Sequence, residues 1–451
     1  MKIFPLLARS YDMRAIYGAD FGDDDIRLVG QALGSWAPEG TIYLGGDARL
    51  STPNLKQAMI DGLLQAGRTV VDIGLVSSDM LQYTTICSAD AALGIMITAS
   101  HNPKEYNGFK MCFKNAAPIN LKLIAPELIH LIETKQLLEL RDQGSLSHRN
   151  LLPAWIDFLA SHAQADLSGF KVVADAGNGT AGVFMQALAE RLGFTLIPLY
   201  FEPDGNFPNH HPSPIESKNV QDLLKKVQET GADIGVAFDG DADRAVLCDE
   251  TGEIINASIT LSAISELFRA ANPGKKILYN ATCSHIVRDT VLAQGGIPLQ
   301  EKVGHVYLKE RMQQDPDIIF GGEHSSHYYF RDMGNADSGV LAFLLILEYL
   351  EQYEMSASEM RIKFGKYQSI EETNFRVTSV PEVLKHLSET FTDVGQEFFD
   401  GLTLDFGEGS WCNIRGSSNE PLIRLNAEAL TQEGLNILVQ KVISEIEKFR
   451  V

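Results

Sequence analysis

The sequence predicts an α/β protein with three related domains and a smaller fourth domain. Strands and helices alternate along most of the chain, an apolar strand ends in a polar loop three times, and the pattern changes after about residue 365. A chain of 451 residues is too long for one hydrophobic core, so two to four domains are expected. We place the domain boundaries at 1–150, 151–254, 255–367 and 368–451.

The composition is that of a globular protein, with 45% hydrophobic and 22% charged residues and a net charge of −21. No apolar run is long enough to span a membrane, and the N-terminus does not resemble a signal peptide, so we expect a cytoplasmic protein. The acidity argues against nucleic acid or an anionic membrane as a partner. The five cysteines are dispersed, which predicts neither a disulfide framework nor a zinc site.

The first domain is expected to begin with an extended segment and then to alternate strands and helices. Residues 41–44 predict a strand, and a helix follows over about 51–66, with Gly67 at its end. Residues 69–73 predict the next strand. The apolar run 93–97 predicts a buried strand that leads into a polar turn.

The later domains show the same alternation of apolar runs and helical periodicity. Strands are predicted at 170–175, 234–238, 275–279, 317–320, 403–406 and 422–425. Helices are predicted over about 220–230, where Gly231 can end the helix, and over 435–449.

The strand at 93–97 presents Ser100 in a tight polar turn, where Asn102 and Pro103 stop regular structure. Ligands of open parallel sheets bind at the carboxyl ends of strands. Taken alone, this serine is an ordinary turn residue. A metal loop on an equivalent strand end would make it a candidate nucleophile or phosphate carrier. His101 and Lys110 are then candidates for proton transfer or phosphate contact.

Asp239, Asp241 and Asp243 alternate in a glycine-containing loop after a predicted strand. Three such carboxylates can turn toward one ion, and hard oxygen ligands favour Mg²⁺ or Ca²⁺. A solvated acidic turn and an EF-hand are the alternatives. Glu250 fits the twelfth position of an EF-hand loop, but Arg244 stands at the sixth position, where glycine is required. We therefore expect a catalytic Mg²⁺ site with one ion per chain.

Two further loops combine polar groups suited to a sugar phosphate. Residues 321–327 offer Glu323 and Ser325, which suit sugar hydroxyls, although a helix cap is an alternative. Residues 415–421, with Arg424 nearby, combine guanidinium groups, hydroxyls and loop amides. These groups donate hydrogen bonds to a phosphate dianion, although a plain surface turn is an alternative.

The segment Gly177-Asn-Gly-Thr-Ala-Gly182 fits the dinucleotide-binding pattern G-x-G-x-x-G. In that interpretation Glu202 would bind the ribose. A single match is weak, and Glu202 precedes a turn. We expect these glycines to form a tight strand-to-helix turn instead.

Taken in order, four loops resemble those of the α-D-phosphohexomutase family of phosphoglucomutases and phosphomannomutases. The loops are Thr98-Ala-Ser-His-Asn-Pro103, Asp239-Gly-Asp-Ala-Asp-Arg244, Gly321-Gly-Glu-His-Ser-Ser-His327 and Arg415-Gly-Ser-Ser-Asn-Glu-Pro421. The resemblance covers essentially the whole chain. It implies three related α/β domains with mixed sheets and a C-terminal α+β domain around a central cleft, closed by movement of the fourth domain.

The resemblance also implies a role for individual residues. Ser100 would carry the phosphate and join the three aspartates as a metal ligand. Lys110 and His101 would be the acid/base residues, and Arg14 would line the cleft as part of the catalytic set. The residues implied to bind substrate are Tyr11, Arg244, His305, Glu323, Ser325, His327, Arg415, Ser417, Ser418, Asn419 and Arg424.

The sequence departs from the family pattern at a few positions. Ala15 replaces the usual glycine after the catalytic-set arginine. Thr282 stands where relatives often have a basic residue, and His285 or Lys302 are candidates to compensate. His324 in the sugar loop leaves the subfamily open.

The implied function is the interconversion of hexose 1-phosphate and hexose 6-phosphate, with mannose and/or glucose as the sugar. The reaction would pass through a phosphoserine and a bisphosphorylated sugar, with a hexose 1,6-bisphosphate as activator. We expect a monomer or a weak homodimer. The alternatives are a phosphoglucosamine mutase, a Mg²⁺-dependent sugar-phosphate phosphatase and a non-catalytic sugar-phosphate-binding protein.

Overall fold

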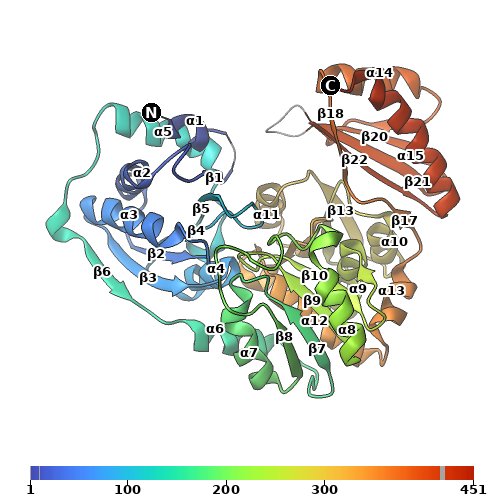
Figure 1. The fold of residues 1–451 in the computed structure, drawn as a ribbon, viewed down its shortest axis with the longest axis horizontal. Coiled ribbons are helices and arrows are strands. Elements are labelled where there is room, and N and C mark those ends of the chain that lie inside the picture. Colours follow the sequence, from blue (N-terminus) through green and yellow to red (C-terminus); the bar gives the residue numbers. More distant parts are fainter. Residues whose placement is uncertain (1, 10, 417–421) are drawn as a thin grey trace. The chain divides into compact units, whose positions relative to one another are not determined.

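The computed structural model describes residues 2–9, 11–416 and 422–451, which form two compact units (Figure 1). The first unit consists of Met1–Asn256, Lys309–Pro316 and Ser325–Ser358. The second unit consists of Ala257–Leu308, Asp317–His324 and Glu359–Val451. The predicted α/β class with mixed sheets is confirmed, whereas the four domain boundaries stay a prediction.

A six-stranded mixed sheet in the order β1-β5-β4-β2-β3-β6 opens the first unit. Its strands are β1 (Met13–Ile16), β2 (Thr41–Gly46), β3 (Thr69–Leu75), β4 (Ala91–Ile97), β5 (Tyr106–Phe113) and β6 (Ser145–His148). Strand β5 is antiparallel to β1 and β4, and the other neighbours are parallel. Every residue of β4 is buried, so this strand reads as a continuous apolar run.

Helices α1 to α5 belong to this part of the chain. They are α1 (Ile3–Leu7), α2 (Asp23–Trp36), α3 (Thr52–Gln65), α4 (Ser78–Cys87) and α5 (Leu121–Glu133). The expected extended start is wrong, because residues 3–7 form α1. Ile3 and Leu7 are four residues apart, so one helical turn brings both into the buried core of this sheet.

A second mixed sheet of the first unit has the order β11-β10-β9-β7-β8. Its strands are β7 (Lys171–Asp175), β8 (Thr195–Leu199), β9 (Ile234–Phe238), β10 (Ala245–Asp249) and β11 (Ile254–Ile255). The helices that accompany it in sequence are α6 (Leu152–His162), α7 (Ala181–Leu192) and α8 (Gln221–Thr230). Gly231 ends α8 in the left-handed conformation, as predicted.

The first unit also contains a later stretch of the chain. Its elements are β15 (Tyr328–Phe330), the 3₁₀ helix Arg331–Met333, β16 (Ala336–Asp337) and α12 (Gly339–Gln352). Helix α12 is buried over most of its length, which fits its nearly uninterrupted apolar sequence. Two helices, α11 (His305–Gln314) and α13 (Ala357–Phe364), contain residues of both units.

The second unit places β12 (Lys276–Asn280) between β13 (Ile297–Glu301) and β14 (Ile318–Gly322), parallel to both. Helices α9 (Ala257–Ala271) and α10 (His285–Ala293) belong to the same stretch. The C-terminal sheet has the order β17-β22-β21-β20-β19, and β18 also pairs with β22.

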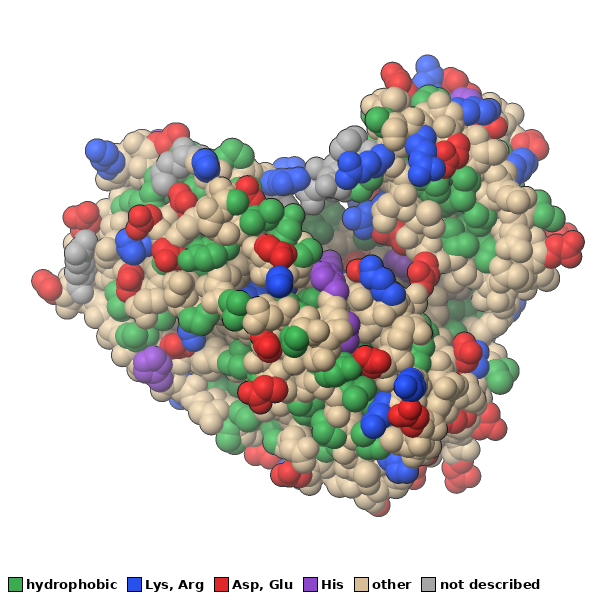
Figure 2. All heavy atoms as spheres, in the orientation of Figure 1, with side chains coloured by type: hydrophobic (Ala, Val, Ile, Leu, Met, Phe, Trp, Pro, Cys, Tyr) green, Lys and Arg blue, Asp and Glu red, His purple; other side chains and the backbone are tan. Residues whose placement is uncertain are grey.

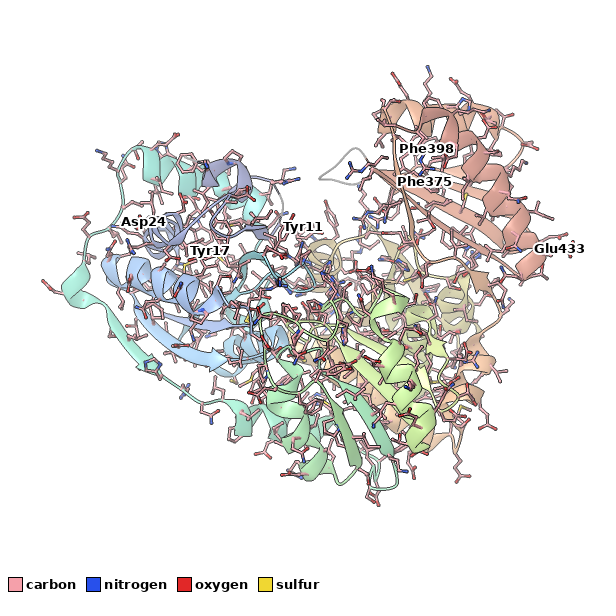
Figure 3. The ribbon with its side chains drawn as sticks, viewed as in Figure 1. Tyr11, Tyr17, Asp24, Phe375, Phe398 and Glu433 are labelled. Atoms are coloured by element: carbon pink, nitrogen blue, oxygen red, sulfur yellow. The ribbon has the colours of Figure 1, made fainter. Side chains whose placement is uncertain are left out.

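The strands of the C-terminal sheet are β17 (Gln368–Ser369), β18 (Thr373–Arg376), β19 (Gly395–Glu397), β20 (Leu402–Gly407), β21 (Ser410–Gly416) and β22 (Leu422–Ala429). Helices α14 (Val380–Thr390) and α15 (Gln432–Ile446) pack on this sheet and share its core. Phe375, labelled in Figure 3, belongs to that core, whereas Phe398 is largely exposed.

Acidic and basic side chains are interspersed over the face of the molecule drawn in Figure 2. In the part of the chain that the structure describes, no helix combines the length and the apolar character needed to cross a membrane.

Candidate active site

Ser100 lies just beyond β4 and is fully buried. Its backbone has φ +52°, a left-handed conformation that is uncommon for a residue with a Cβ atom. Its Oγ donates a hydrogen bond to Asp239 Oδ2 at 2.9 Å, and Nδ1 of His101 lies 3.3 Å from the same oxygen. Strained backbone of this kind is concentrated at functional sites.

The aspartate cluster (Asp239, Asp241 and Asp243) follows β9 and is buried. One ligand oxygen from each residue lies within 4.8 Å of the others. Gly240 lies against the serine turn (residues 98–105, between β4 and β5), because a Cβ at this position would be 2.7 Å from the carbonyl oxygen of Ser100. Glycine therefore allows the two loops to approach this closely.

Lys110 on β5 compensates part of the negative charge. Its Nζ lies 2.7 Å from Asp241 Oδ2 and also contacts Asp243. Burial alone would lower the pKa of Lys110, but the charges of Asp241 and Asp243 outweigh it and raise this pKa. Burial raises the pKa of Asp239 well above its usual value, and the other two carboxylates add to the rise.

The aspartate cluster fits a hard cation. Among the described residues, Asp241 Oδ1 and Asp243 Oδ1 are buried without a hydrogen-bond partner. A buried carboxylate oxygen without a partner carries a large desolvation cost, which a bound cation would remove. The EF-hand alternative is wrong, because the Glu250 carboxylate accepts hydrogen bonds from the backbone and side chain of Ser358.

Arg14 reaches this region from β1. Its guanidinium donates to Asn102 Oδ1 at 3.2 Å and to Asp12 Oδ2 at 3.2 Å. Burial alone would lower the pKa of Arg14, but Asp12, Asp241 and Asp243 raise it, so the group is held as a cation. Tyr11, labelled in Figure 3, lies on the segment between α1 and β1.

Two further predicted substrate residues meet beside the aspartate cluster. Arg244 Nε donates to His327 Nε2 at 2.9 Å. Nδ1 of His327 lies 2.9 Å from the carboxylate of Asp337, and the Lys309 ammonium lies 2.7 Å from the other oxygen of Asp337. In a second group of possible metal ligands, Asp243, His327 and Asp337, the two carboxylates are already paired with lysines, Asp243 with Lys110 and Asp337 with Lys309.

Sequence reasoning missed several residues of this site. Ser78, at the start of α4, donates to Asp241 Oδ2 at 2.6 Å. The adjacent Asp79 is buried, which raises its pKa to about 7, and it accepts a hydrogen bond from Ser338. The signal that could have found Ser78 is the polar start of a helix that follows a parallel strand, which places it at the same sheet edge.

In the second unit, Glu323 follows β14 and is buried. Its Oε1 accepts a hydrogen bond from the backbone N–H of Gly304 at 2.8 Å and a long one from Asn280 at 3.5 Å. His305 begins α11 directly after this contact. Ser325, another predicted residue of the sugar loop, is half-buried and belongs to the first unit.

His285 and Lys302, the two candidates to compensate for Thr282, both contact aromatic rings. Thr282 Oγ1 donates to Asn280 Oδ1 at 3.1 Å. His285 stacks on Trp411 at a ring distance of 5.1 Å, and the Lys302 ammonium lies 5.9 Å from the ring centre of Phe399.

The arginine cluster (Arg415 and Arg424) lies on adjacent strands, β21 and β22, in directly opposed positions. Glu372 binds both, with its carboxylate 2.8 Å from Arg415 Nη2 and 2.7 Å from Arg424 Nη1. Burial alone would raise the pKa of Glu372, but the two arginines lower it to about 2. The predicted phosphate-loop residues Ser417, Ser418 and Asn419 lie outside the described residues.

The segment that fits the dinucleotide pattern forms the expected turn between β7 and α7. Its glycines serve packing within the chain. A Cβ on Gly179 would lie 2.7 Å from the carbonyl oxygen of Gly240, and one on Gly182 would lie 1.9 Å from that of Phe201. The turn therefore packs closely against the loop that carries the aspartate cluster.

Comparisons with known proteins agree with this geometry. Three descriptions of the phosphoglucomutase/phosphomannomutase family match the chain. Alpha/beta/alpha domain I matches residues 5–137, domain II matches residues 153–252, and domain III matches residues 256–367. A phosphomannomutase from Vibrio cholerae is 34% identical over 460 residues, and the match covers 98% of each chain.

Solved structures show the same relationship. The crystal structure of a phosphoglucomutase/phosphomannomutase family protein from Burkholderia thailandensis has a TM-score of 0.86 at 28% identity, covering 99% of this chain and 97% of that one. An N-acetylglucosamine-phosphate mutase shares the fold at 13% identity and a TM-score of 0.59, covering 97% of this chain and 96% of that one. Because the family descriptions and a close relative span most of its length, the chain belongs to the phosphoglucomutase/phosphomannomutase family and is a phosphohexomutase.

Proposed function

We propose that this phosphohexomutase interconverts hexose 1-phosphate and hexose 6-phosphate, with mannose and/or glucose as the sugar, and that Ser100 carries the phosphoryl group. One observation carries the proposal. The Ser100 hydroxyl lies 2.9 Å from Asp239 in a cluster of buried carboxylates, two of whose oxygens have no hydrogen-bond partner among the residues that the structure describes. A nucleophile beside an incomplete set of cation ligands suits phosphoryl transfer.

The reaction consists of two transfers. A hydroxyl oxygen of the hexose monophosphate attacks the phosphorus on phosphorylated Ser100, the bond between that phosphorus and Oγ breaks, and the hydroxyl proton passes to a base. The bisphosphorylated sugar then reorients. Its other phosphoryl group returns to Ser100 Oγ by the reverse chemistry, which releases the isomeric monophosphate. A hexose 1,6-bisphosphate would serve as activator, because it can phosphorylate Ser100 directly.

Asp239, Asp241 and Asp243, together with Ser100, would hold one Mg²⁺ ion. When bound, the ion would neutralise charge on the transferred phosphoryl group. Lys110 and His101 are the proposed acid/base residues, since one contacts the aspartate cluster and the other faces the serine oxygen.

The remaining predicted residues are proposed to bind the substrate. Arg14, Tyr11, Arg244 and His327 would act from the first unit. His305, Glu323 and Ser325 would bind the sugar hydroxyls. The phosphate that is not being transferred would be held by Arg415, Arg424, Ser417, Ser418 and Asn419. The planar guanidinium group suits this role, because its paired N–H donors match the oxygens of a phosphate.

The choice of mannose and glucose over glucosamine rests on the relatives. The phosphomannomutase from Vibrio cholerae is 34% identical, whereas the N-acetylglucosamine-phosphate mutase is 13% identical. A phosphoglucosamine mutase is therefore not favoured. We also propose that the protein is cytoplasmic and is a monomer or a weak homodimer.

One assay tests the function. The protein is incubated with Mg²⁺, a trace of hexose 1,6-bisphosphate and, in parallel, mannose, glucose or glucosamine 1-phosphate. We expect isomerisation of the first two substrates. Release of inorganic phosphate without isomerisation would indicate a phosphatase, and no reaction would indicate a binding protein.

The Ser100→Ala variant tests the carrier role in the same assay. Its turnover is expected to fall at least about 1,000-fold, because the nucleophile is removed. Ser145→Ala, at an exposed position on β6, is the matched control and should keep wild-type turnover. Full turnover by the Ser100→Ala variant would disprove the carrier role.

A further inference from the structure

Arg49 is a charged residue that the proposed reaction does not use, although it is almost completely buried, with 1% of its surface exposed. It follows β2, which is the parallel neighbour of β4, the strand that leads to Ser100. Complete burial of an arginine is rare and costly unless its donors are bonded. The partners of Arg49 therefore indicate what it does.

The guanidinium of Arg49 binds the backbone of the serine turn. It donates to four carbonyl oxygens, those of Ser100 (2.7 Å), Asn102 (2.6 Å), Pro103 (2.6 Å) and Tyr106 (3.0 Å). Its fifth donor, Nε, lies 3.1 Å from Asp47 Oδ2. All five N–H groups of the guanidinium thus have an acceptor; three of these acceptors belong to the serine turn, and a fourth, Tyr106, begins β5.

Asp47 links the Arg49 guanidinium to the backbone N–H of Ser100 through Thr98. The backbone N–H of Ser100 donates to Thr98 Oγ1 at 2.8 Å, and that hydroxyl donates to Asp47 Oδ2 at 2.7 Å. The N–H and the carbonyl of Ser100 are therefore both held by groups that meet at one buried carboxylate. This arrangement explains how Ser100 keeps its left-handed backbone conformation.

Two residues of another loop pack against Arg49 and its backbone. The aromatic ring of Phe207 lies 5.3 Å from the guanidinium carbon. Gly205 allows close packing, because a Cβ there would lie 2.3 Å from the backbone nitrogen of Leu50. The guanidinium is thus enclosed by the serine turn, by the strand-end loop that carries it and by the loop around residue 205.

We propose that Arg49 is a positioning residue for phosphoryl transfer. It holds the serine turn so that Ser100 Oγ lies beside Asp239, and it touches neither substrate nor metal. The proposal rests on the proposed carrier role of Ser100. A lysine cannot replace Arg49, because an ammonium donates from one point whereas the planar guanidinium reaches four separate carbonyls.

The test compares Arg49→Lys with Arg331→Lys in the full-length protein. Arg331 is the matched control, because its guanidinium also donates to two backbone carbonyls of the first unit, those of Met312 and Asp315. For Arg49→Lys we expect kcat to fall about 100-fold, with KM for the sugar phosphate within about threefold of wild type. Intact-mass measurements should show slower phosphorylation of Ser100 by hexose 1,6-bisphosphate, and Arg331→Lys should match wild type in both assays.

A loss of stability alone would not produce this split between kcat and KM in protein that remains folded by circular dichroism. Wild-type kcat and a wild-type rate of Ser100 phosphorylation in folded Arg49→Lys would overturn the proposal. If wild-type protein turns over without ever carrying phosphate on Ser100, then the carrier role has failed instead, which is a separate result.

If Arg49→Lys does not fold, the pair Thr98→Val and Thr98→Ser decides. Valine keeps the shape of threonine but removes the hydroxyl between Asp47 and the Ser100 N–H, so kcat should fall at least tenfold. Serine restores the hydroxyl and should recover most of the activity. Equal activity of the two variants would overturn the proposal.

Discussion

The aspartate cluster of the first unit and the arginine cluster of the second unit both gather like charges, but they balance them differently. The aspartates are buried, and two of their carboxylate oxygens have no partner among the described residues. The arginines are 14% and 37% exposed, and Glu372 already bridges them. The aspartate cluster can therefore accept a further cation, whereas the charges of the arginine cluster are already balanced in part by Glu372.

This difference indicates how each cluster should respond to substitution. Electrostatic interactions in a buried site are strong, and changes there act on the chemical step. The arginine cluster is more exposed than the aspartate cluster, so water screens its charges more, and charged hydrogen bonds there contribute mainly to binding. We therefore expect the aspartate cluster to control kcat and the arginine cluster to control KM.

The largest effect is expected for Asp241→Asn. It removes one charged ligand and leaves Lys110 with one carboxylate partner, so kcat should fall about 1,000-fold, in line with the several kcal/mol that a metal supplies to a transition state. The measurement is steady-state turnover over a titration of Mg²⁺. The control is Asp61→Asn, on α3. An unchanged kcat and an unchanged Mg²⁺ requirement would show that this cluster is not the metal site.

Gly240→Ala should come next. The new Cβ would lie 2.7 Å from the carbonyl oxygen of Ser100, so the serine turn and the aspartate loop must move apart. We expect kcat to fall between about 10-fold and 100-fold, because displacement of a reacting group by about 1 Å has effects of that size. The control is Gly22→Ala, whose added Cβ would have no heavy atom within 4 Å, so kcat should be unchanged. A large KM effect with normal kcat would contradict the division of roles.

Arg415→Lys tests the other side of the comparison. Lysine loses the paired donors of the guanidinium, so KM for the sugar phosphate should rise about 10-fold, with kcat within about threefold of wild type. Arg424→Lys should have a smaller effect, since that side chain is more exposed. Arg376→Lys, at an exposed position on β18, serves as control. A loss of kcat without a change in KM would place Arg415 in the chemical step.

The smallest effect on activity is expected for Glu372→Gln, which acts on local stability. The pKa of Glu372 is about 2 in the folded chain against an ordinary value of 4.5. A lowered carboxyl pKa stabilises the fold above pH 4.5, and that stabilisation is lost as the pH falls from 4.5 toward 2. At pH 7 the variant should lose about 1–3 kcal/mol of local stability around β21 and β22.

Hydrogen exchange on the full-length chain measures this change, because the units need not unfold together. The difference in protection of β21 and β22 between wild type and Glu372→Gln should shrink between pH 5 and pH 3. Glu371→Gln, at the exposed neighbouring position, is the control. A difference that does not depend on pH would mean that the charge of Glu372 does not stabilise these strands.

The strands that end at the proposed catalytic loops could be predicted from the sequence, because a buried strand appears as a short apolar run. Residues 234–238 were predicted as a strand and form β9 with the same bounds, followed directly by Asp239. The apolar run before Ser100 likewise became β4. The start of the chain was mispredicted, because a five-residue helix such as α1 is stabilised by its contacts with the core and has little periodicity of its own.

The residues missed in the site share one property, since each acts through a partner that is distant in sequence. Arg49 reaches the turn around Ser100, Ser78 reaches Asp241, and Glu372 reaches Arg415. Local pattern indicates that such residues are polar, but it does not reveal which buried group they will meet. Their roles follow from the packing of strands and loops.

The fold class, the order of the chemical loops and the family resemblance could be read from the amino-acid sequence, because turn residues, apolar runs and loop motifs are local features. The pairing of the charges depends on three-dimensional packing: Lys110 pairs with two aspartates, Glu372 with two arginines, and Arg49 with four carbonyl oxygens between residues 100 and 106. The physical reason is that a buried charge must find its partner in space. Hydrogen bonds and ion pairs act over a few ångströms, whatever the separation along the chain.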